Sequence, residues 1–161
     1  MSDTQVAWPL VNNIIRGMSE NNTFGMVRKL ANGSPKPHQG WDFSASIGTT
    51  VYAIADGTVE FVKNNGDYGR QLCLSFNFDG TMYYAFYAHL QTTSVAAGAK
   101  VEMNDAIGTT GNSGNASNLP HSQDHLHFEI RTKLKPGAGL ADRISPLKIF
   151  KRCPLKAGIP G

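Results

Sequence analysis

Two histidines separated by one residue, His125 and His127, lie in a segment whose residue types could support metal-assisted chemistry. From Asp124 to Arg131 apolar side chains occupy alternate positions, and histidine, glutamate and arginine stand between them. This period of two predicts a half-buried strand with both imidazoles on its polar face, about 7 Å apart. At that spacing one imidazole can bind a metal ion while the other reaches a substrate atom or water beside it. Taken alone, the motif fits a solvent-facing strand equally well.

A second pair of metal-ligand types, His38 and Asp42, lies far upstream. Pro37 and Gly40 argue against a helix there, so the segment is predicted as a loop that enters a strand. Across this turn the pair can offer one nitrogen and one oxygen to the same ion. With His127 they make two imidazoles and one carboxylate, which is the ligand set of a catalytic zinc site with one position left open.

Three further polar residues have two readings each. His89 ends an apolar strand, where it is either a polar strand terminus or a member of the site. His121 lies in a polar loop, where an exposed loop histidine is favoured over one that touches substrate or caps the metal. Glu129 shares a strand face with the histidine pair, so it either orients a ligating histidine or is a surface carboxylate.

Short strands and turns account for most of the remaining chain. We expect strands at 24–28, 51–55, 58–63, 71–76 and 81–90, a hairpin-like segment at 100–108, a helical turn at 11–15, and loops at 32–37 and 110–123. The Asp56-Gly57 pair is a strong signal for a hairpin turn. The predicted fold class is all-β: a single domain, 1–161, of short antiparallel strands forming a sheet or open barrel-like core with a loop-walled active-site groove. Its core spans about 8–150, and 151–161 form a tail.

Composition sets further bounds. A chain of 161 residues with 40% apolar residues suffices for one packed core. The net charge of +3 modestly favours anionic surfaces, but no run of lysine and arginine interleaved with aromatics supports nucleic-acid binding. No apolar stretch can span a bilayer, and the N-terminus lacks the features of a signal peptide. Cys73 and Cys153 either form one disulfide or stay free.

The ordered set of motifs resembles the lysostaphin-type (LytM-like) zinc metallopeptidases, which cut peptide bridges of bacterial peptidoglycan. The resemblance covers about 8–150. It rests on Phe24-Gly25-x-x-Arg28, His38-x-Gly40-x-Asp42-Phe43, Val51-Tyr52-Ala53-x-Ala55-Asp56-Gly57-Thr58-Val59, Tyr68-Gly69, Tyr87-Ala88-His89-Leu90, Ile107-Gly108-x-x-Gly111-x-Ser113-Gly114, His125-Leu126-His127-Phe128-Glu129-Ile130-Arg131 and Ser145-Pro146-Leu147.

This resemblance implies one Zn²⁺ per chain, held by His38, Asp42 and His127, with His89 and His125 as the catalytic pair. It implies a zinc endopeptidase acting on peptidoglycan stem peptides or cross-bridges. The chain departs from the family in the loop 115–123, which is longer than usual, and in Asp124, which takes a position usually held by proline.

Other readings stay open. The chain is alternatively a non-catalytic regulatory or binding module of the same fold, or a zinc enzyme for other peptides. The missing leader, unusual for this family, favours delivery to the cell wall by a secretion machine or by lysis. That would suit an antibacterial effector, with an immunity protein as partner, or a phage lysis or tail enzyme.

Overall fold

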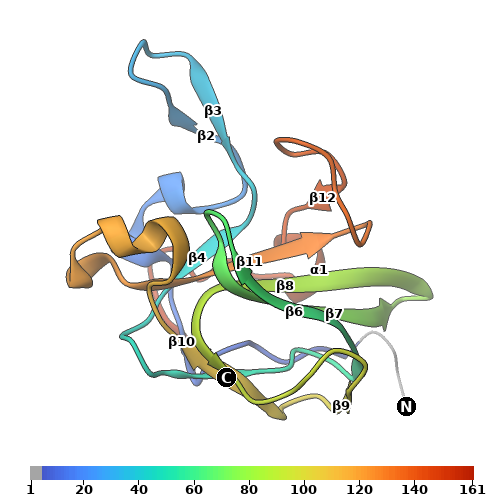
Figure 1. Ribbon diagram of the computed structural model, residues 1–161. Coiled ribbons are helices and arrows are strands. Elements are labelled where there is room, and N and C mark those ends of the chain that lie inside the picture. Colours follow the sequence, from blue (N-terminus) through green and yellow to red (C-terminus); the bar gives the residue numbers. More distant parts are fainter. Residues whose placement is uncertain (1–4) are drawn as a thin grey trace.

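The strands form one large antiparallel sheet and two small ones (Figure 1). The computed structural model describes residues 5–161, and within them the large sheet has nine strands. Its main path runs β12-β11-β8-β7-β6-β9, while β4 pairs with β11 and β10 pairs with both β8 and β5. These strands are β4 (Trp41–Ser44), β5 (Thr50–Tyr52), β6 (Gly57–Asn65), β7 (Gly69–Phe78), β8 (Thr81–Thr93), β9 (Lys100–Val101), β10 (Ala106–Thr110), β11 (His125–Arg131) and β12 (Arg143–Ile144). The predicted all-β class is confirmed.

Two short strand pairs flank the large sheet. Strands β1 (Asn12–Asn13) and β13 (Ile159–Pro160) pair with each other, so the predicted tail packs back on the start of the chain. Strands β2 (Gly25–Lys29) and β3 (Pro35–His38) form a hairpin that projects from the body (Figure 1). Helical structure is brief. It comprises η1 (Arg16–Met18), η2 (Glu20–Asn22), η3 (Gly114–Asn118), η4 (His121–Gln123) and α1 (Leu147–Phe150).

An aromatic cluster fixes the strands that carry the site. The ring of Phe128 on β11 packs edge-on against Phe43 of β4 and Tyr87 of β8, with centroid separations of 6.1 Å and 5.2 Å. All three side chains are fully buried. Because such a core is close-packed, it holds β4, β11 and β8 at fixed spacing beneath their polar side chains.

Two hairpin predictions were wrong. Strands β5 and β6 flank Asp56-Gly57 without pairing, because β5 pairs with β10 and β6 pairs with β7 and β9. The Asp56 carboxylate instead accepts a hydrogen bond from the Met103 backbone nitrogen at 2.8 Å. Gly57 is needed for close approach, since a Cβ there would lie 2.0 Å from the Ser75 carbonyl oxygen. Likewise β9 and β10, in the segment predicted as hairpin-like, do not pair with each other.

Two local predictions were also wrong, for the same kind of reason. Residues 11–15 are extended rather than helical, because the Asn13 amide bonds the Leu10 carbonyl at 2.7 Å and the Ile159 carbonyl at 3.0 Å. The helical turns come later, in η1 and η2. The predicted loop 32–37 ends in β3, which pairs with β2. A distant partner, Ile159, decided the first segment, and the neighbouring strand β2 decided the second.

The structure also describes the state of the two cysteines and the character of the helices. Cys73 and Cys153 are both free thiols. Within residues 5–161, none of the helices has the length and apolar character needed to cross a membrane.

Candidate active site

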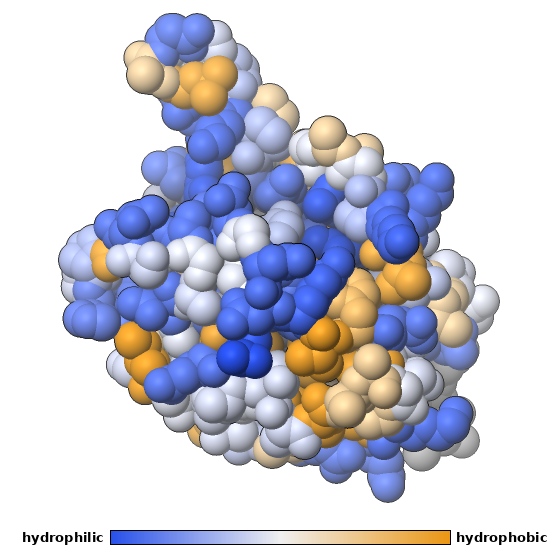
Figure 2. All heavy atoms as spheres, in the orientation of Figure 1, coloured by the Kyte–Doolittle hydropathy of each residue, from blue (hydrophilic) through white to orange (hydrophobic). Residues whose placement is uncertain are grey.

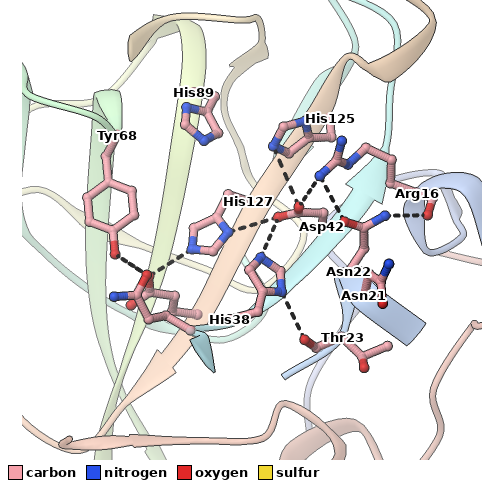
Figure 3. Close-up of polar contacts among 12 residues, drawn as sticks. Arg16, Asn21, Asn22, Thr23, His38, Asp42, Tyr68, His89, His125 and His127 are labelled. Atoms are coloured by element: carbon pink, nitrogen blue, oxygen red, sulfur yellow. Dashed lines mark hydrogen bonds and ion pairs between the residues drawn. The ribbon is translucent and has the colours of Figure 1, made fainter. Parts of the chain in front are cut away.

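Three adjacent strands of the large sheet, together with the end of β3, bring the predicted residues together (Figure 3). On β11, His127 stands opposite Asp42 of β4 on one side and opposite Ala88 of β8 on the other. His89 follows Ala88, and His38 ends β3 just before β4. The register of the large sheet brings together Asp42 and His127, which are 85 residues apart in sequence, and the end of β3 adds His38.

His38, Asp42 and His127 form a compact ligand set. One donor atom from each lies within 4.8 Å of the other two. Asp42 Oδ1 is 2.9 Å from His127 Nδ1 and 3.2 Å from His38 Nε2. All three side chains are buried, so the set is shielded from bulk water.

The remaining ring nitrogen of each ligand histidine has its own acceptor. His38 Nδ1 donates to the Thr23 carbonyl oxygen at 2.9 Å, and His127 Nε2 donates to Glu129 Oε2 at 2.7 Å. Such outer partners select the tautomer whose free nitrogen faces the metal. The contact between His127 Nδ1 and Asp42 Oδ1 is a hydrogen bond that needs a proton on Nδ1. A metal ion bound by both atoms would replace that proton. Two imidazoles and one carboxylate in this arrangement fit zinc.

The charges of this set depend on its hydrogen bonds. Burial by itself lowers the pKa of His127, but its bonds to Asp42 and Glu129 outweigh burial and raise the pKa to about 9. Burial would raise the pKa of Asp42, yet hydrogen bonds with His127 and His38 hold it well below its usual value. Burial lowers the pKa of His38. At neutral pH His127 is therefore protonated on both ring nitrogens and positively charged, while His38 is neutral.

We expect the zinc affinity of the metal-free protein to rise with pH. A raised pKa means that His127 holds its proton more tightly, and zinc must displace that proton below pH 9. The apparent affinity should therefore increase about tenfold per pH unit from pH 7 to about 9 and then level off. Titration against a competing chelator at several pH values measures it. A flat profile over this range would contradict the assignment of the proton to His127.

His89 and His125 are anchored by carbonyl groups and face the ligand set. His89 Nδ1 donates to the Ser113 carbonyl at 2.8 Å, and His125 Nδ1 donates to the Gln123 carbonyl at 2.9 Å. Their rings lie edge to face with centroids 5.0 Å apart. Burial lowers the pKa of both histidines, that of His89 to about 4, so both are neutral at pH 7. Each thus keeps an unprotonated Nε2 as a proton acceptor, and that of His125 is 3.8 Å from Asp42 Oδ2.

A backbone irregularity aims His89 at the site. Its backbone φ of 60° lies in the left-handed region, which residues other than glycine adopt uncommonly. The register between β7 and β8 shifts beside it, and the His89 backbone nitrogen donates to the Tyr68 carbonyl at 2.9 Å. Such bulges re-aim side chains near functional sites.

The turn that leads into β7 at Gly69 contacts the segment that contains Ser113 and Gly114, next to His89. The Ser113 hydroxyl accepts from the Arg70 backbone nitrogen at 3.0 Å and donates to the Leu90 carbonyl at 2.7 Å. The backbones of the two segments contact each other at Gly69 and Gly114. A Cβ on Gly114 would lie 2.2 Å from the Asp67 carbonyl oxygen.

We therefore expect Gly114→Ala to destabilise the protein by about 2–4 kcal/mol, from a left-handed φ and a backbone clash together. Gly66→Ala is the matched control, because Gly66 has a φ of +65° but open space around its Cβ position. Thermal unfolding of both variants separates the cost of the backbone clash, present only in Gly114→Ala, from the cost of a left-handed φ, present in both. Equal losses in the two variants would show that the loop contact contributes nothing.

Glu129 is buried, so the reading as a surface carboxylate was wrong, as was the expectation that β11 is only half-buried. The polar face of β11 is covered by the side chains that bind Glu129. Besides His127, Glu129 binds Tyr68 Oη, Arg131 Nε and Arg143 Nε, each at 2.8 Å. Burial would raise the pKa of Glu129, but the bond from His127 and the two arginines hold it well below the usual range.

We expect Glu129→Gln to weaken zinc binding about 10- to 100-fold, because His127 loses the carboxylate that orients it. Leaving two buried arginines without their anion should also lower the free energy of unfolding by about 3–5 kcal/mol. Zinc titration and denaturant unfolding measure the two effects. Glu102→Gln, at an exposed position, should change neither. Unchanged zinc affinity in Glu129→Gln would contradict the orienting role.

Two arginines on Asp42 were missed by sequence reasoning. Arg16 Nη2 and Arg28 Nη2 lie 2.9 Å and 3.1 Å from Asp42 Oδ2, the oxygen that faces away from His127. Asn22 Oδ1 accepts from both arginines, at 2.8 Å and 3.0 Å. Arg28 belongs to the motif Phe24-Gly25-x-x-Arg28, for which no role was predicted. No sequence pattern predicts that Arg16 or Asn22 belongs to the site.

His121 does not join the cluster. Its side chain is 79% exposed and pairs with Asp124 Oδ2 at 3.0 Å. The exposed-loop reading favoured from the sequence agrees with this placement. The loop around it contributes Asn115 and Leu119 to the wall of the groove.

The site opens into a groove of about 560 Å³. Side chains of both charges and several polar groups line it. They are Arg16, Arg28, Lys36, Pro37, His38, Gln39, Asp42, Asp67, Tyr68, His89, Asn115, Leu119, His125 and His127. All five predicted site residues are among them.

The sequence and the fold have counterparts among known proteins. Residues 36–138 match the sequence model of Peptidase family M23. The chain belongs to peptidase family M23.

Individual relatives agree with this assignment. The peptidoglycan DD-endopeptidase ShyA of Vibrio cholerae serotype O1 is 34% identical over 100 residues, which are 62% of this chain and 21% of ShyA. The catalytic domain of the antimicrobial peptidase lysostaphin from Staphylococcus simulans has a TM-score of 0.62 and 27% identity, covering 81% of this chain and 90% of that domain. A zinc-containing peptidase from Vibrio cholerae has a TM-score of 0.65 and 26% identity over 86% of this chain and 37% of its own. The chain spans about a fifth of the length of curated relatives such as ShyA.

Proposed function

We propose that the protein is a zinc-dependent endopeptidase that hydrolyses peptide bonds in peptidoglycan stem peptides or cross-bridges. The observation that carries the proposal is the buried set of His38, Asp42 and His127, faced by two neutral histidines at the floor of a groove. Membership of family M23 and similarity to the peptidoglycan DD-endopeptidase ShyA support the substrate class.

The ligand set would hold one zinc ion through His38 Nε2, Asp42 Oδ1 and His127 Nδ1. Zinc bound in such a site supplies Lewis-acid polarisation of a carbonyl group and acidifies water. Glu129 and the Thr23 carbonyl keep the two ligand imidazoles in the required tautomer. Burial of the set excludes bulk water, which strengthens every electrostatic interaction inside it.

His89 and His125 would handle protons. Each has its Nδ1–H held by a backbone carbonyl, so Nε2 can accept a proton from the attacking water and return one to the leaving amine. Once protonated, either imidazole can also donate to the oxyanion of the tetrahedral intermediate. The lowered pKa of both groups keeps them in the acceptor form before the reaction begins.

Digestion of purified peptidoglycan, resolved by mass, tests this function. The zinc-loaded protein should produce new peptide ends, a chelator should abolish them, and added zinc should restore them. The masses of the products also identify the bond that is cut. If the folded, zinc-loaded protein cleaves no type of cell wall, the alternative of a non-catalytic binding module of the same fold replaces this proposal.

Delivery as an antibacterial effector, or release by lysis, stays a prediction. An immunity protein would then have to block the groove. Co-purification of a tight stoichiometric inhibitor with the protein would support that role. A native precursor carrying a cleavable signal sequence would contradict it.

A further inference from the structure

We propose that the wall of the groove formed by the β2–β3 hairpin is a subsite for a carboxylate of the substrate, with Lys36 and Arg28 as its recognition groups. The proposal rests on the function proposed above and narrows it. The substrate would be a cross-linked stem peptide that carries a free carboxylate beside the scissile amide, in preference to a neutral glycine bridge.

The register of the hairpin places two cations side by side. Arg28 of β2 and Lys36 of β3 are direct cross-strand partners, and both line the groove. Like charges directly opposite each other destabilise a strand pair. Lys36 is exposed and has no ion pair with any residue in 5–161. An anion between the two side chains would relieve their repulsion.

Arg28 has donor capacity left for such an anion. Its Nε binds the Asn21 carbonyl, and its Nη2 binds Asn22 and Asp42, while Nη1 makes no hydrogen bond within the described chain. Asp42 is already paired with Arg16, so one carboxylate is shared by two guanidinium groups.

One residue of another element carries the opposite charge. Asp67 is exposed in the turn between β6 and β7 and lines the same groove. A carboxylate on the substrate is repelled by Asp67 and attracted to Lys36 and Arg28. This difference in charge along the lining favours one orientation of a charged peptide over the other.

The β2–β3 hairpin carries Arg28 and Lys36 at the edge of the groove. It projects from the body, and Figure 2 shows its surface as mostly hydrophilic, with an apolar area near the tip. The exposed apolar residues of the hairpin are Met26 and Leu30. Alternation along β2 places Lys29 next to Arg28 but on the other face, and Lys29 does not line the groove. Lys29 is thus a matched control with the same charge on the same element.

The test uses two synthetic cross-linked stem-peptide dimers that differ only in whether the carboxylate beside the scissile amide is free or amidated. We expect the zinc-loaded protein to prefer the free carboxylate. Lys36→Gln should raise KM for that dimer about threefold to fivefold, leave kcat within about twofold, and leave the amidated dimer unaffected. The effect should shrink at high salt, because the lysine is exposed. Lys29→Gln should alter none of these values.

Several outcomes would overturn the subsite. It fails if the wild type cleaves both dimers equally, or if Lys36→Gln and Lys29→Gln behave alike. It also fails if Lys36→Gln only weakens adhesion to walls that carry phosphate polymers. If the wild type cleaves neither dimer, the proposed function fails instead. Calorimetric binding of the two dimers to His125→Ala, with and without Lys36→Gln, then still decides the subsite.

Discussion

Replacement of His127 by alanine is expected to abolish peptidoglycan hydrolysis. The variant loses one of the three proposed zinc ligands and leaves the Asp42 and Glu129 carboxylates without the group that bridges them. Because the metal supplies several kcal/mol of transition-state stabilisation, turnover should fall at least about 10³-fold. The release of muropeptides measures turnover, and atomic absorption should find less than one zinc per chain.

His121→Ala serves as the control for this variant. It removes an exposed histidine outside the ligand set and should leave both activity and zinc content unchanged. Circular dichroism must show that His127→Ala is folded. If the folded variant keeps activity within about tenfold of the wild type, His127 is not a ligand that catalysis requires.

Removal of either groove histidine should slow turnover while zinc stays bound. General acid–base groups contribute about 10²- to 10⁴-fold, so His125→Ala and His89→Asn should each lower kcat by that order. Asparagine is chosen for His89 because it tolerates the left-handed backbone, with its φ of 60°. Neither side chain belongs to the ligand set.

The zinc content separates this prediction from the first. Both variants should retain one zinc per chain, in contrast to His127→Ala. The kcat of each variant on a defined peptide, compared with that of the double variant, shows whether the two imidazoles act as a unit. Normal turnover in one variant would assign proton transfer to the other histidine alone.

The sequence predicted the members of the site better than their surroundings. His125 and His127 follow from strict alternation, and β11 forms as that pattern predicts. Alternation also indicated a solvated polar face, which was wrong because arginines from β11 and β12 neutralise Glu129 inside the protein. Alternation distinguishes two faces of a strand. It does not reveal what covers each face.

Most of the remaining errors have a physical origin in non-local pairing. Asp56-Gly57 has the composition of a hairpin turn, yet its flanking strands find partners elsewhere in the sheet. Arg16 reaches Asp42 across 26 residues, and no local pattern records such a contact. Turn propensity and periodicity describe neighbours in sequence. This site is held by contacts between segments distant in sequence.

The distance in sequence between Asp42 and His127 has a consequence for synthesis. The strand that carries His127 must insert between β4 and β8, both of which precede it in the chain. A nascent chain therefore exposes His38 and Asp42 long before their third partner has been translated. The set of His38, Asp42 and His127 is completed only when β11 has left the ribosome and docked, so a chain that ends before that strand lacks one of its three members.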